Sequence, residues 1–150
     1  MIKQKWMYFL GVFGLGFLAD QVTKYWALQT LRGRSLTLWK GILELRLREN
    51  VGSAFGLMLL SRFGILVITV GLTIAFLLWM GKRNEVSLLF LLGGSLFLAG
   101  AWGNLLDRLR WGYVVDFIEP SFWATFNLGD VLILGGVFLF GYRLLLHGKW

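Results

Sequence analysis

The fold is decided by two apolar runs and the short polar loop between them. They read FGILVITVGLTIAFLLWM (Phe63–Met80), GKRNE (Gly81–Glu85) and VSLLFLLGGSLFLAGAWG (Val86–Gly103). Neither apolar run contains a charged residue, and each reaches the roughly 17–25 residues that a helix needs to cross a bilayer. The polar loop predicts a tight hairpin between two antiparallel transmembrane helices.

Two further apolar segments, residues 6–22 and 127–146, contain a few charged side chains but are also long enough to cross a bilayer. The sequence therefore predicts an all-α membrane protein, a four-transmembrane-helix bundle that forms one integral membrane domain. The expected spans are about 6–22, 63–80, 86–103 and 127–146, within a domain of residues 1–150. Lys3 and Lys5 also suit a cleavable signal peptide, but no small-x-small cleavage site follows them, so we favour a span.

The composition excludes several classes of protein. Hydrophobic residues make up 57% of the chain and charged residues 15%, whereas soluble domains average about 45–50% and about 25%. The chain has no cysteine and a single histidine, His147, so a disulfide, a thiol nucleophile or a Ser-His-Asp triad is not expected. We expect no metal and no cofactor. The net charge is +7, and the basic residues flank the apolar runs. This placement indicates attraction to membrane lipids and no binding to nucleic acid.

The long connection after the first span has a pattern typical of a strand. Leu43, Leu45 and Leu47 alternate with charged residues, which gives one apolar and one charged face. We expect this segment to belong to a small β-sheet on the membrane surface. Upstream, the chain is expected to continue over Tyr25–Leu31 as a short interfacial helix.

The charges alone leave the orientation open. An even number of spans places both termini on the same side of the membrane. With cytoplasmic termini, six basic residues lie inside and nine outside, which is opposite to the positive-inside rule. The six are Lys3, Lys5, Lys82, Arg83, Arg143 and Lys149, and the nine are Lys24, Arg32, Arg34, Lys40, Arg46, Arg48, Arg62, Arg108 and Arg110.

All four aspartates fall on one side of the membrane in this layout, together with three asparagines. They are Asp20, Asp107, Asp116 and Asp130, with Asn50, Asn104 and Asn127. Ionisable groups near hydrocarbon are costly, so they are candidates for function. The alternative is that each merely ends a helix and lies in water.

Local context separates the acids from one another. Asn104 and Asp107 stand three apart and share a helix face if the third span continues that far. Asn127 precedes the fourth span at a capping position, with Asp130 at the third helical position, where the helix dipole favours a carboxylate. Asp116 lies between Val-Val and Phe-Ile, so desolvation is expected to raise its pKa. Two neighbouring carboxylates that share a proton can activate water as an aspartic protease does.

Five ordered motifs carry a resemblance that covers essentially the whole chain. They are DQVTK (Asp20–Lys24), ENVGSAFG (Glu49–Gly56), GAWGNLLDR (Gly100–Arg108), VVDFI (Val114–Ile118) and FNLGD (Phe126–Asp130). With them the sequence resembles the bacterial lipoprotein signal peptidases, the signal peptidase II family. That family removes signal peptides from prolipoproteins by cleaving on the amino side of a cysteine that already carries diacylglycerol.

The resemblance implies roles for particular residues. Asp116 and Asp130 match the family's catalytic aspartates. Its supporting or substrate-binding positions fall on Asn50, Gly52, Asn104, Arg108 and Asn127, and its structural polar positions fall on Asp20, Lys24 and Asp107. The chain departs from the family's usual residues at Ser53, Ala99 and Gly129, and Gly129 adjoins a catalytic candidate.

The resemblance also implies a cellular setting. It implies a multi-pass protein of the bacterial cytoplasmic (inner) membrane, with cytoplasmic termini. The small β-sheet would be extracytoplasmic, and the active site would lie near the extracytoplasmic face. The expected partners are prolipoproteins bearing diacylglyceryl-cysteine, and membrane lipids. We expect a monomer.

Other functions fit parts of the sequence. The aspartates could serve a proton- or cation-conducting protein, although such a relay should distribute acids through the membrane. A structural four-helix subunit and a Ser/Lys protease using Ser53 and Lys24 are further alternatives. Small residues such as Gly93, Gly94, Gly135 and Gly136 are expected to allow close helix packing.

Overall fold

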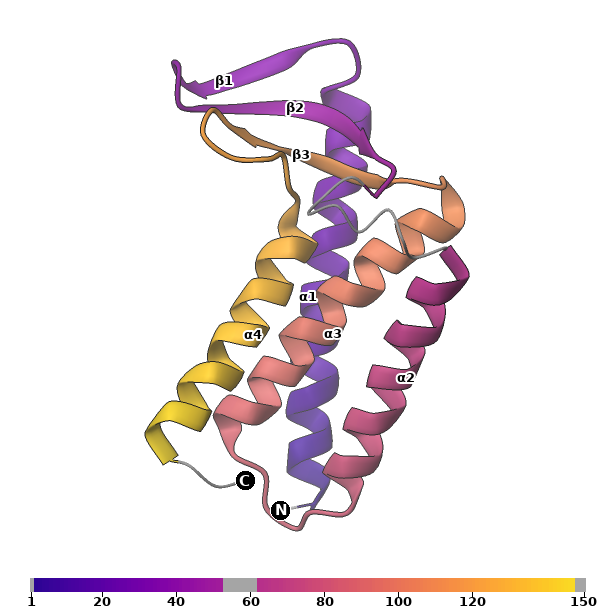
Figure 1. Ribbon diagram of the computed structural model, residues 1–150, viewed down its shortest axis with the longest axis vertical. Coiled ribbons are helices and arrows are strands. Elements are labelled where there is room, and N and C mark those ends of the chain that lie inside the picture. The colour runs from indigo at the N-terminus through magenta and orange to yellow at the C-terminus, as the bar shows by residue number, and fades with distance from the viewer. Residues whose placement is uncertain (1, 53–61, 148–150) are drawn as a thin grey trace.

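The computed structural model describes residues 2–52 and 62–147. The elements are α1 (Ile2–Thr30), β1 (Ser35–Trp39), β2 (Leu43–Asn50), α2 (Arg62–Gly81), α3 (Leu88–Arg110), β3 (Val114–Pro120) and α4 (Leu128–His147). The helices run side by side, and the three strands lie together over one end of the bundle (Figure 1). Helix α1 begins, and α4 ends, at the opposite end. Residues Ser53–Gly56 of the second motif lie outside the described residues.

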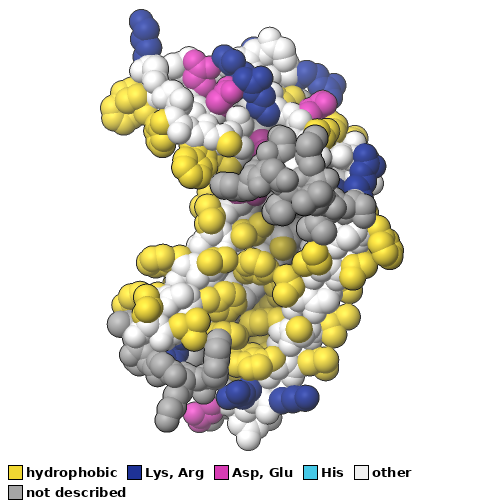
Figure 2. Space-filling view, in the orientation of Figure 1, with side chains coloured by type: hydrophobic (Ala, Val, Ile, Leu, Met, Phe, Trp, Pro, Cys, Tyr) yellow, Lys and Arg dark blue, Asp and Glu magenta, His cyan; other side chains and the backbone are white. Residues whose placement is uncertain are grey.

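Three described helices are long and apolar enough to cross a bilayer: Arg62–Gly81, Leu88–Arg110 and Leu128–Leu145. Helix α1 has 29 residues but does not meet the same criterion, because Asp20, Gln21 and Lys24 interrupt its second half. The prediction of membrane-spanning helices is therefore confirmed for three of the four expected spans. Figure 2 shows most charged side chains of that face at the two ends of the molecule, with hydrophobic side chains between them.

Glycines allow α3 to pack closely against its neighbours. A Cβ atom on Gly93 would lie 3.1 Å from the Gly136 carbonyl oxygen, and one on Gly136 would lie 2.6 Å from the Gly93 carbonyl oxygen. A Cβ on Gly94 would lie 2.2 Å from the Phe76 ring. The expected packing role holds for these three glycines. It is wrong for Gly135, which has no atom within 4 Å of the position that its Cβ would take.

The predicted sheet is present as three antiparallel strands in the order β1-β2-β3. Its inner face covers the end of α1, where Ala27 and Leu31 are buried against Phe117 of β3. These contacts explain why α1 continues without a break to Thr30. The helix expected to continue over Tyr25–Leu31 is present as the end of α1, as far as Thr30. Tyr25 and Trp26 are exposed there, while Ala27 and Leu31 are buried.

Candidate active site

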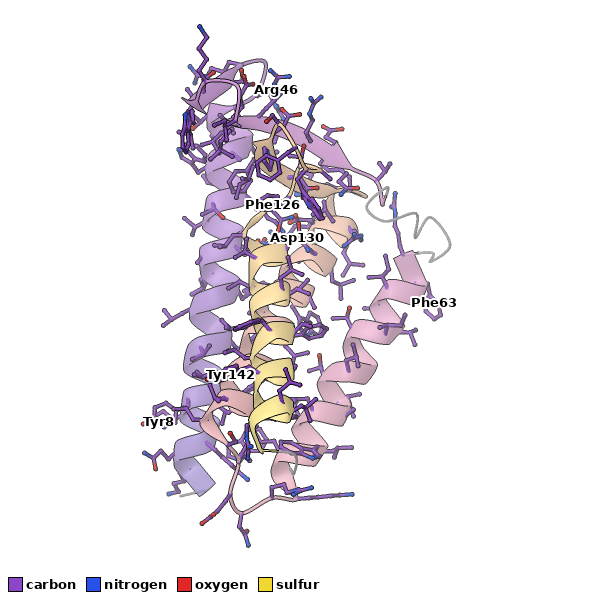
Figure 3. All side chains as sticks on the ribbon, turned by 60° about the vertical axis from the view of Figure 1, so that its left-hand side comes forward. Tyr8, Arg46, Phe63, Phe126, Asp130 and Tyr142 are labelled. Atoms are coloured by element: carbon purple, nitrogen blue, oxygen red, sulfur yellow. The ribbon has the colours of Figure 1, made fainter. Side chains whose placement is uncertain are left out.

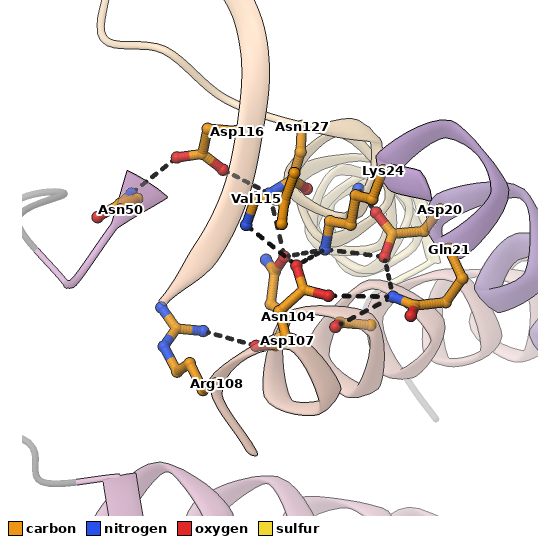
Figure 4. Close-up of polar contacts among 12 residues, drawn as sticks. Asp20, Gln21, Lys24, Asn50, Asn104, Asp107, Arg108, Val115, Asp116 and Asn127 are labelled. Atoms are coloured by element: carbon orange, nitrogen blue, oxygen red, sulfur yellow. Dashed lines mark hydrogen bonds and ion pairs between the residues drawn. The ribbon is translucent and has the colours of Figure 1, made fainter. Parts of the chain in front are cut away.

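The polar residues singled out in the sequence meet below the sheet, where α1, α3, β3 and the start of α4 come together (Figures 3 and 4). Asp116 comes from β3, Asp130 from the first turn of α4, Asn104 from α3, and Asn50 from the last residue of β2. Figure 3 shows Asp130 at the sheet end of α4 just below Phe126, and Tyr142 close to the other end. Residues more than 100 positions apart thus share one site.

The start of α4 fixes Asp130. The Asp130 backbone N–H donates to Asn127 Oδ1 at 3.0 Å, and the Asn127 backbone N–H donates to Asp130 Oδ2 at 3.1 Å. This reciprocal pair is a capping box, which satisfies two N–H groups that a helix start otherwise leaves free. The helix start predicted at these two residues is therefore present, and one Asp130 oxygen is held by its own helix.

Asp116 is buried in β3, with 1% of its surface exposed. Its Oδ1 accepts a hydrogen bond from Asn127 Nδ2 at 2.6 Å, and its Oδ2 accepts one from Asn50 Nδ2 at 2.8 Å. Burial, with a smaller contribution from the negative charge of Asp130, raises the pKa of Asp116 to about 6 against the opposing effect of the two amide donors. This carboxyl group can therefore hold or release a proton near neutral pH, which is a property of catalytic acids and bases.

Asn127 links the two carboxyl groups. Its backbone N–H faces Asp130, while its side-chain amide donates to Asp116 Oδ1 and, at 3.1 Å, to Asn104 Oδ1. A single residue therefore sets the position of both acids. Because its side chain is completely buried, Asn127 has little freedom to turn away from either of them.

The amide of Asn104 has only one possible orientation. Its Oδ1 accepts from Lys24 Nζ at 2.8 Å and from Asn127, so its Nδ2 faces Asp130 Oδ1 at 2.8 Å. A lysine ammonium has donors and no acceptor, so the reverse orientation of the amide would place two donors against each other. Lys24 thus determines which end of Asn104 faces the candidate catalytic carboxylate.

Lys24 is itself the centre of a buried ion network. Its Nζ lies 2.9 Å from Asp20 Oδ2 and 2.9 Å from Asp107 Oδ2. Asp20 Oδ1 also accepts from the Gly129 backbone N–H at 2.7 Å, which pins the start of α4, and Asp107 Oδ2 accepts from the Val115 backbone N–H at 3.1 Å, which pins β3. Ion pairs of this kind need such additional hydrogen bonds to offset desolvation.

Two further predicted residues lie at the edge of this network. The Arg108 Nη1 donates to the backbone oxygen of Asn104 at 3.2 Å. The Gly52 backbone N–H donates to Asn50 Oδ1 at 2.9 Å, and Gly52 has a φ of 115°, a conformation that favours glycine. Gly52 therefore helps to orient Asn50, whose other amide atom faces Asp116.

The two carboxyl groups open into a cavity of about 680 Å³. Its polar end contains Asn50, Asn104, Arg108, Asp116 and Asp130. The rest is apolar and is lined mainly by α4 and by the loop before it: Val131, Ile133, Leu134, Phe138, Trp123 and Phe126. A site of this form can hold a polar reacting group beside a long apolar substituent.

The sequence did not single out several of these residues. Phe126 is held by hydrogen bonds between its backbone and Phe117 and Ile118, a pairing without a local pattern. Gln21 donates to Asp20 Oδ2 at 3.1 Å and so joins the ion network. Its place within the DQVTK motif was the signal that could have identified it. Ser53, the nucleophile of the Ser/Lys alternative, lies outside the described residues, and Lys24 is engaged by two carboxylates.

The part of the chain that the structure describes does not offer a set of side chains that could form a metal centre. Within residues 2–52 and 62–147, no group of three or more His, Cys, Asp or Glu side chains is placed to hold a metal ion. The polar side chains that line the cavity are two carboxyl groups, two amides, one guanidinium and the hydroxyl of Thr125.

Comparisons with known proteins agree with this arrangement. The sequence model of the family described as "Signal peptidase (SPase) II" matches residues 12–146. A lipoprotein signal peptidase of Syntrophomonas wolfei is 38% identical over 144 residues, which cover 95% of this chain and 96% of that protein. The lipoprotein signal peptidase of Caldanaerobacter subterraneus is 40% identical over 131 residues, covering 86% of this chain and 90% of that protein.

A solved structure is similar over almost the full length. It is described as "Bacterial membrane enzyme structure by the in meso method at 1.9 A resolution", and it matches with a TM-score of 0.82 and 30% identity, covering 93% of each chain. The family match, the relatives and the shared fold extend over nearly all of the sequence. The chain therefore belongs to the signal peptidase II family.

Proposed function

We propose that this chain removes signal peptides from prolipoproteins, cleaving before a diacylglyceryl-modified cysteine, with Asp116 and Asp130 as an aspartic dyad. The observation that carries the proposal is a single cavity that has both carboxyl groups at one end and a long apolar wall beside them. A lipid-modified peptide would place its scissile bond at the polar end and its acyl chains against α4. Family membership supports the same activity.

In the proposed mechanism, Asp116 carries the shared proton at rest and Asp130 is ionised. The capping box stabilises the Asp130 anion, while burial favours the protonated form of Asp116. Asp130 removes a proton from a water molecule that attacks the scissile carbonyl carbon, and Asp116 donates its proton to the carbonyl oxygen. Collapse of the tetrahedral intermediate breaks the carbon–nitrogen bond. The proton now on Asp130 passes to the leaving amine, and one hydroxyl of the intermediate returns its proton to Asp116 as the carbonyl re-forms.

The amides and Arg108 support this chemistry in the proposal. Asn104, Asn127 and Asn50 together place an N–H donor on every oxygen of the two acids. Arg108 lies in the cavity wall and would hold a substrate carbonyl or a lipid phosphate by its remaining N–H groups. The dyad needs no metal or cofactor.

For the membrane layout, we propose that α1 is the fourth span, with cytoplasmic termini and the site near the extracytoplasmic face of a monomer in the bacterial inner membrane. A helix of 29 residues is about 44 Å long, more than the roughly 30 Å hydrocarbon core. The chain has no cysteine, so single cysteines at Thr37 and Asn84 can be tested with an impermeant maleimide. The proposed layout predicts that the maleimide, added from outside, labels Thr37→Cys and not Asn84→Cys. The opposite result would show that the orientation is reversed.

The dyad is tested by replacing each acid separately. Asp116→Asn and Asp130→Asn should each reduce processing of a lipidated precursor in membranes by at least about 1000-fold, since each removes one proton-transfer group from the reaction. Glu119→Gln is the matched control, because Glu119 lies on the same strand as Asp116 but pairs with the exposed Arg48. Undiminished cleavage by either Asp variant would refute the dyad.

The proton- or cation-conducting alternative gains nothing from the geometry. A relay would need acidic side chains through the depth of the membrane. The described residues of α2 include no Asp or Glu, and the one acid of α3, Asp107, lies near the end of the helix that meets the sheet.

A further inference from the structure

A second polar cavity lies at the other end of the bundle, far from the dyad. It is enclosed by the last turn of α2, the hairpin loop, the start of α3 and the last turns of α4. On the same scale as the 680 Å³ of the dyad cavity its volume is about 30 Å³. Its polar wall consists of Arg83, Glu85, Ser87 and Arg143. Two arginines and one glutamate give this wall a net positive charge.

Arg143 is incompletely paired. Its Nε donates to Ser87 Oγ at 3.1 Å, but its Nη1 is buried and has no hydrogen-bond partner. Within residues 2–52 and 62–147, it is the one buried side-chain nitrogen or oxygen in this condition. A buried guanidinium N–H without an acceptor is costly and calls for a missing partner. The partner that suits it is an anion.

Other groups around the cavity also favour an anion. Ser87 precedes α3, yet its hydroxyl makes no capping hydrogen bond to that helix, because it accepts from Arg143. The positive end of the α3 dipole therefore faces the cavity without a side-chain cap. Arg83 stacks over the Trp79 ring at 5.3 Å, which holds a second guanidinium at the wall and places an aromatic ring beside it.

We propose that this cavity, the Arg143 site, binds the phosphodiester group of a membrane phospholipid. Its phosphate oxygens would accept hydrogen bonds from Arg143 Nη1 and from Arg83, and the Ser87 hydroxyl can donate its proton to the phosphate while it accepts from Arg143. Glu85 on the same wall would accept from a glycerol hydroxyl or an ethanolamine ammonium of the headgroup. The site therefore suits phosphatidylglycerol or phosphatidylethanolamine.

The surroundings favour a lipid over free phosphate as the source of this group. The outward side chains of the last turns of α4 are apolar and uncovered: Leu144 is 45% exposed and Leu145 is 88% exposed. A Trp beside a basic cluster at the end of apolar helices is typical of the headgroup level of a bilayer. Acyl chains could thus lie along α4 while the phosphate occupies the cavity, as in other basic pockets between transmembrane helices.

The test uses the purified full-length chain in a neutral detergent. Phosphatidylglycerol should raise the midpoint of thermal unfolding, because a ligand that binds only the folded state stabilises it. Arg143→Gln should weaken the apparent affinity by about 10-fold or more, since a charged hydrogen-bond donor is lost. Lys82→Gln is the matched control, because it removes one charge from the same loop outside the cavity wall, and it should leave the affinity within about twofold.

Further measurements distinguish a lipid from free phosphate as the ligand and allow for an Arg143 variant that does not fold. Inorganic phosphate and neutral diacylglycerol should each give no shift at the concentrations where phosphatidylglycerol acts. If inorganic phosphate reproduces the whole shift, or if Arg143→Gln responds like the unmodified chain, the lipid site is refuted. Should Arg143→Gln not fold, Arg83→Gln replaces it and must also weaken binding. The site does not depend on the proposed catalytic function, since cleavage is not among its readouts.

Discussion

The hydrogen bond from Asn50 to Asp116 offers a direct test of how the dyad is tuned. In Asn50→Ala, Asp116 Oδ2 loses the donor that lies 2.8 Å away. A donor facing a carboxylate stabilises the anion, so its loss raises the pKa of Asp116 above the value of about 6 that burial now sets. Charged groups that act on Asp116, namely Lys24, Arg108 and Asp130, remain in place.

The size of the shift follows from the strength of that bond. A hydrogen bond to a charged group contributes about 1.5–3 kcal/mol, and one pKa unit corresponds to about 1.36 kcal/mol. Water that enters in place of the amide would restore part of the lost hydrogen-bond energy. The lower end of the range, about 1.5 kcal/mol, therefore applies, and the pKa of Asp116 should rise by about one unit. In the proposed mechanism Asp116 must be protonated, so the alkaline limb of the pH–kcat/KM profile should move upward by that amount.

The assay is cleavage of a lipidated precursor peptide across pH 5–9 in detergent micelles. Thr37→Ala, on the exposed strand β1, is the control and should keep the original profile. A profile in which neither limb moves, although Asn50→Ala is folded and active, would refute the claim that this bond tunes Asp116. An upward shift of the acidic limb instead would show that Asp116 acts as the base and would exchange the two proposed roles.

Two further predictions concern stability, measured as unfolding of the detergent-solubilised chain. Lys24→Met should lower the free energy of unfolding by about 3–5 kcal/mol, because it leaves two buried carboxylates without a cation; adding Asp20→Asn should recover part of the loss, and no recovery would contradict the ion-network account. Gly103→Ala should destabilise by about 1–3 kcal/mol or more, because its Cβ would lie 2.1 Å from Asp20 Oδ2. Gly14→Ala, with open space around it, should be neutral or stabilising by up to about 1 kcal/mol, and equal losses in both variants would contradict this reasoning.

Features with a local cause were predictable from the sequence. The charge-free runs at Phe63–Met80 and Val86–Gly103 became α2 and α3, because length and hydropathy alone decide such helices. The strand over Leu43–Leu47 followed from its alternating pattern. The start of α4 followed from the capping pair Asn127 and Asp130, whose hydrogen bonds join residues three apart.

Features that depend on distant partners were not predictable. The burial of Ala27 and Leu31 at the end of α1 rests on their contact with Phe117 of β3, which lies more than 80 residues later. Gly135 adjoins Gly136 but has open space where its Cβ would lie, and it lines the dyad cavity. The motifs indicated which polar residues belong to the site, yet the orientation of the Asn104 amide depends on Lys24, a contact across 80 positions.

The bridge that Asn127 makes between the acids has a consequence for the timing of activity during biosynthesis. The ribosome completes β3 with Asp116 before it completes α4 with Asp130, and Asn127 joins the two only once α4 has docked against α3. A chain halted after β3 contains one acid without its partner and without the amide that positions it. With the proposed dyad, the nascent chain stays inactive until its last helix is inserted.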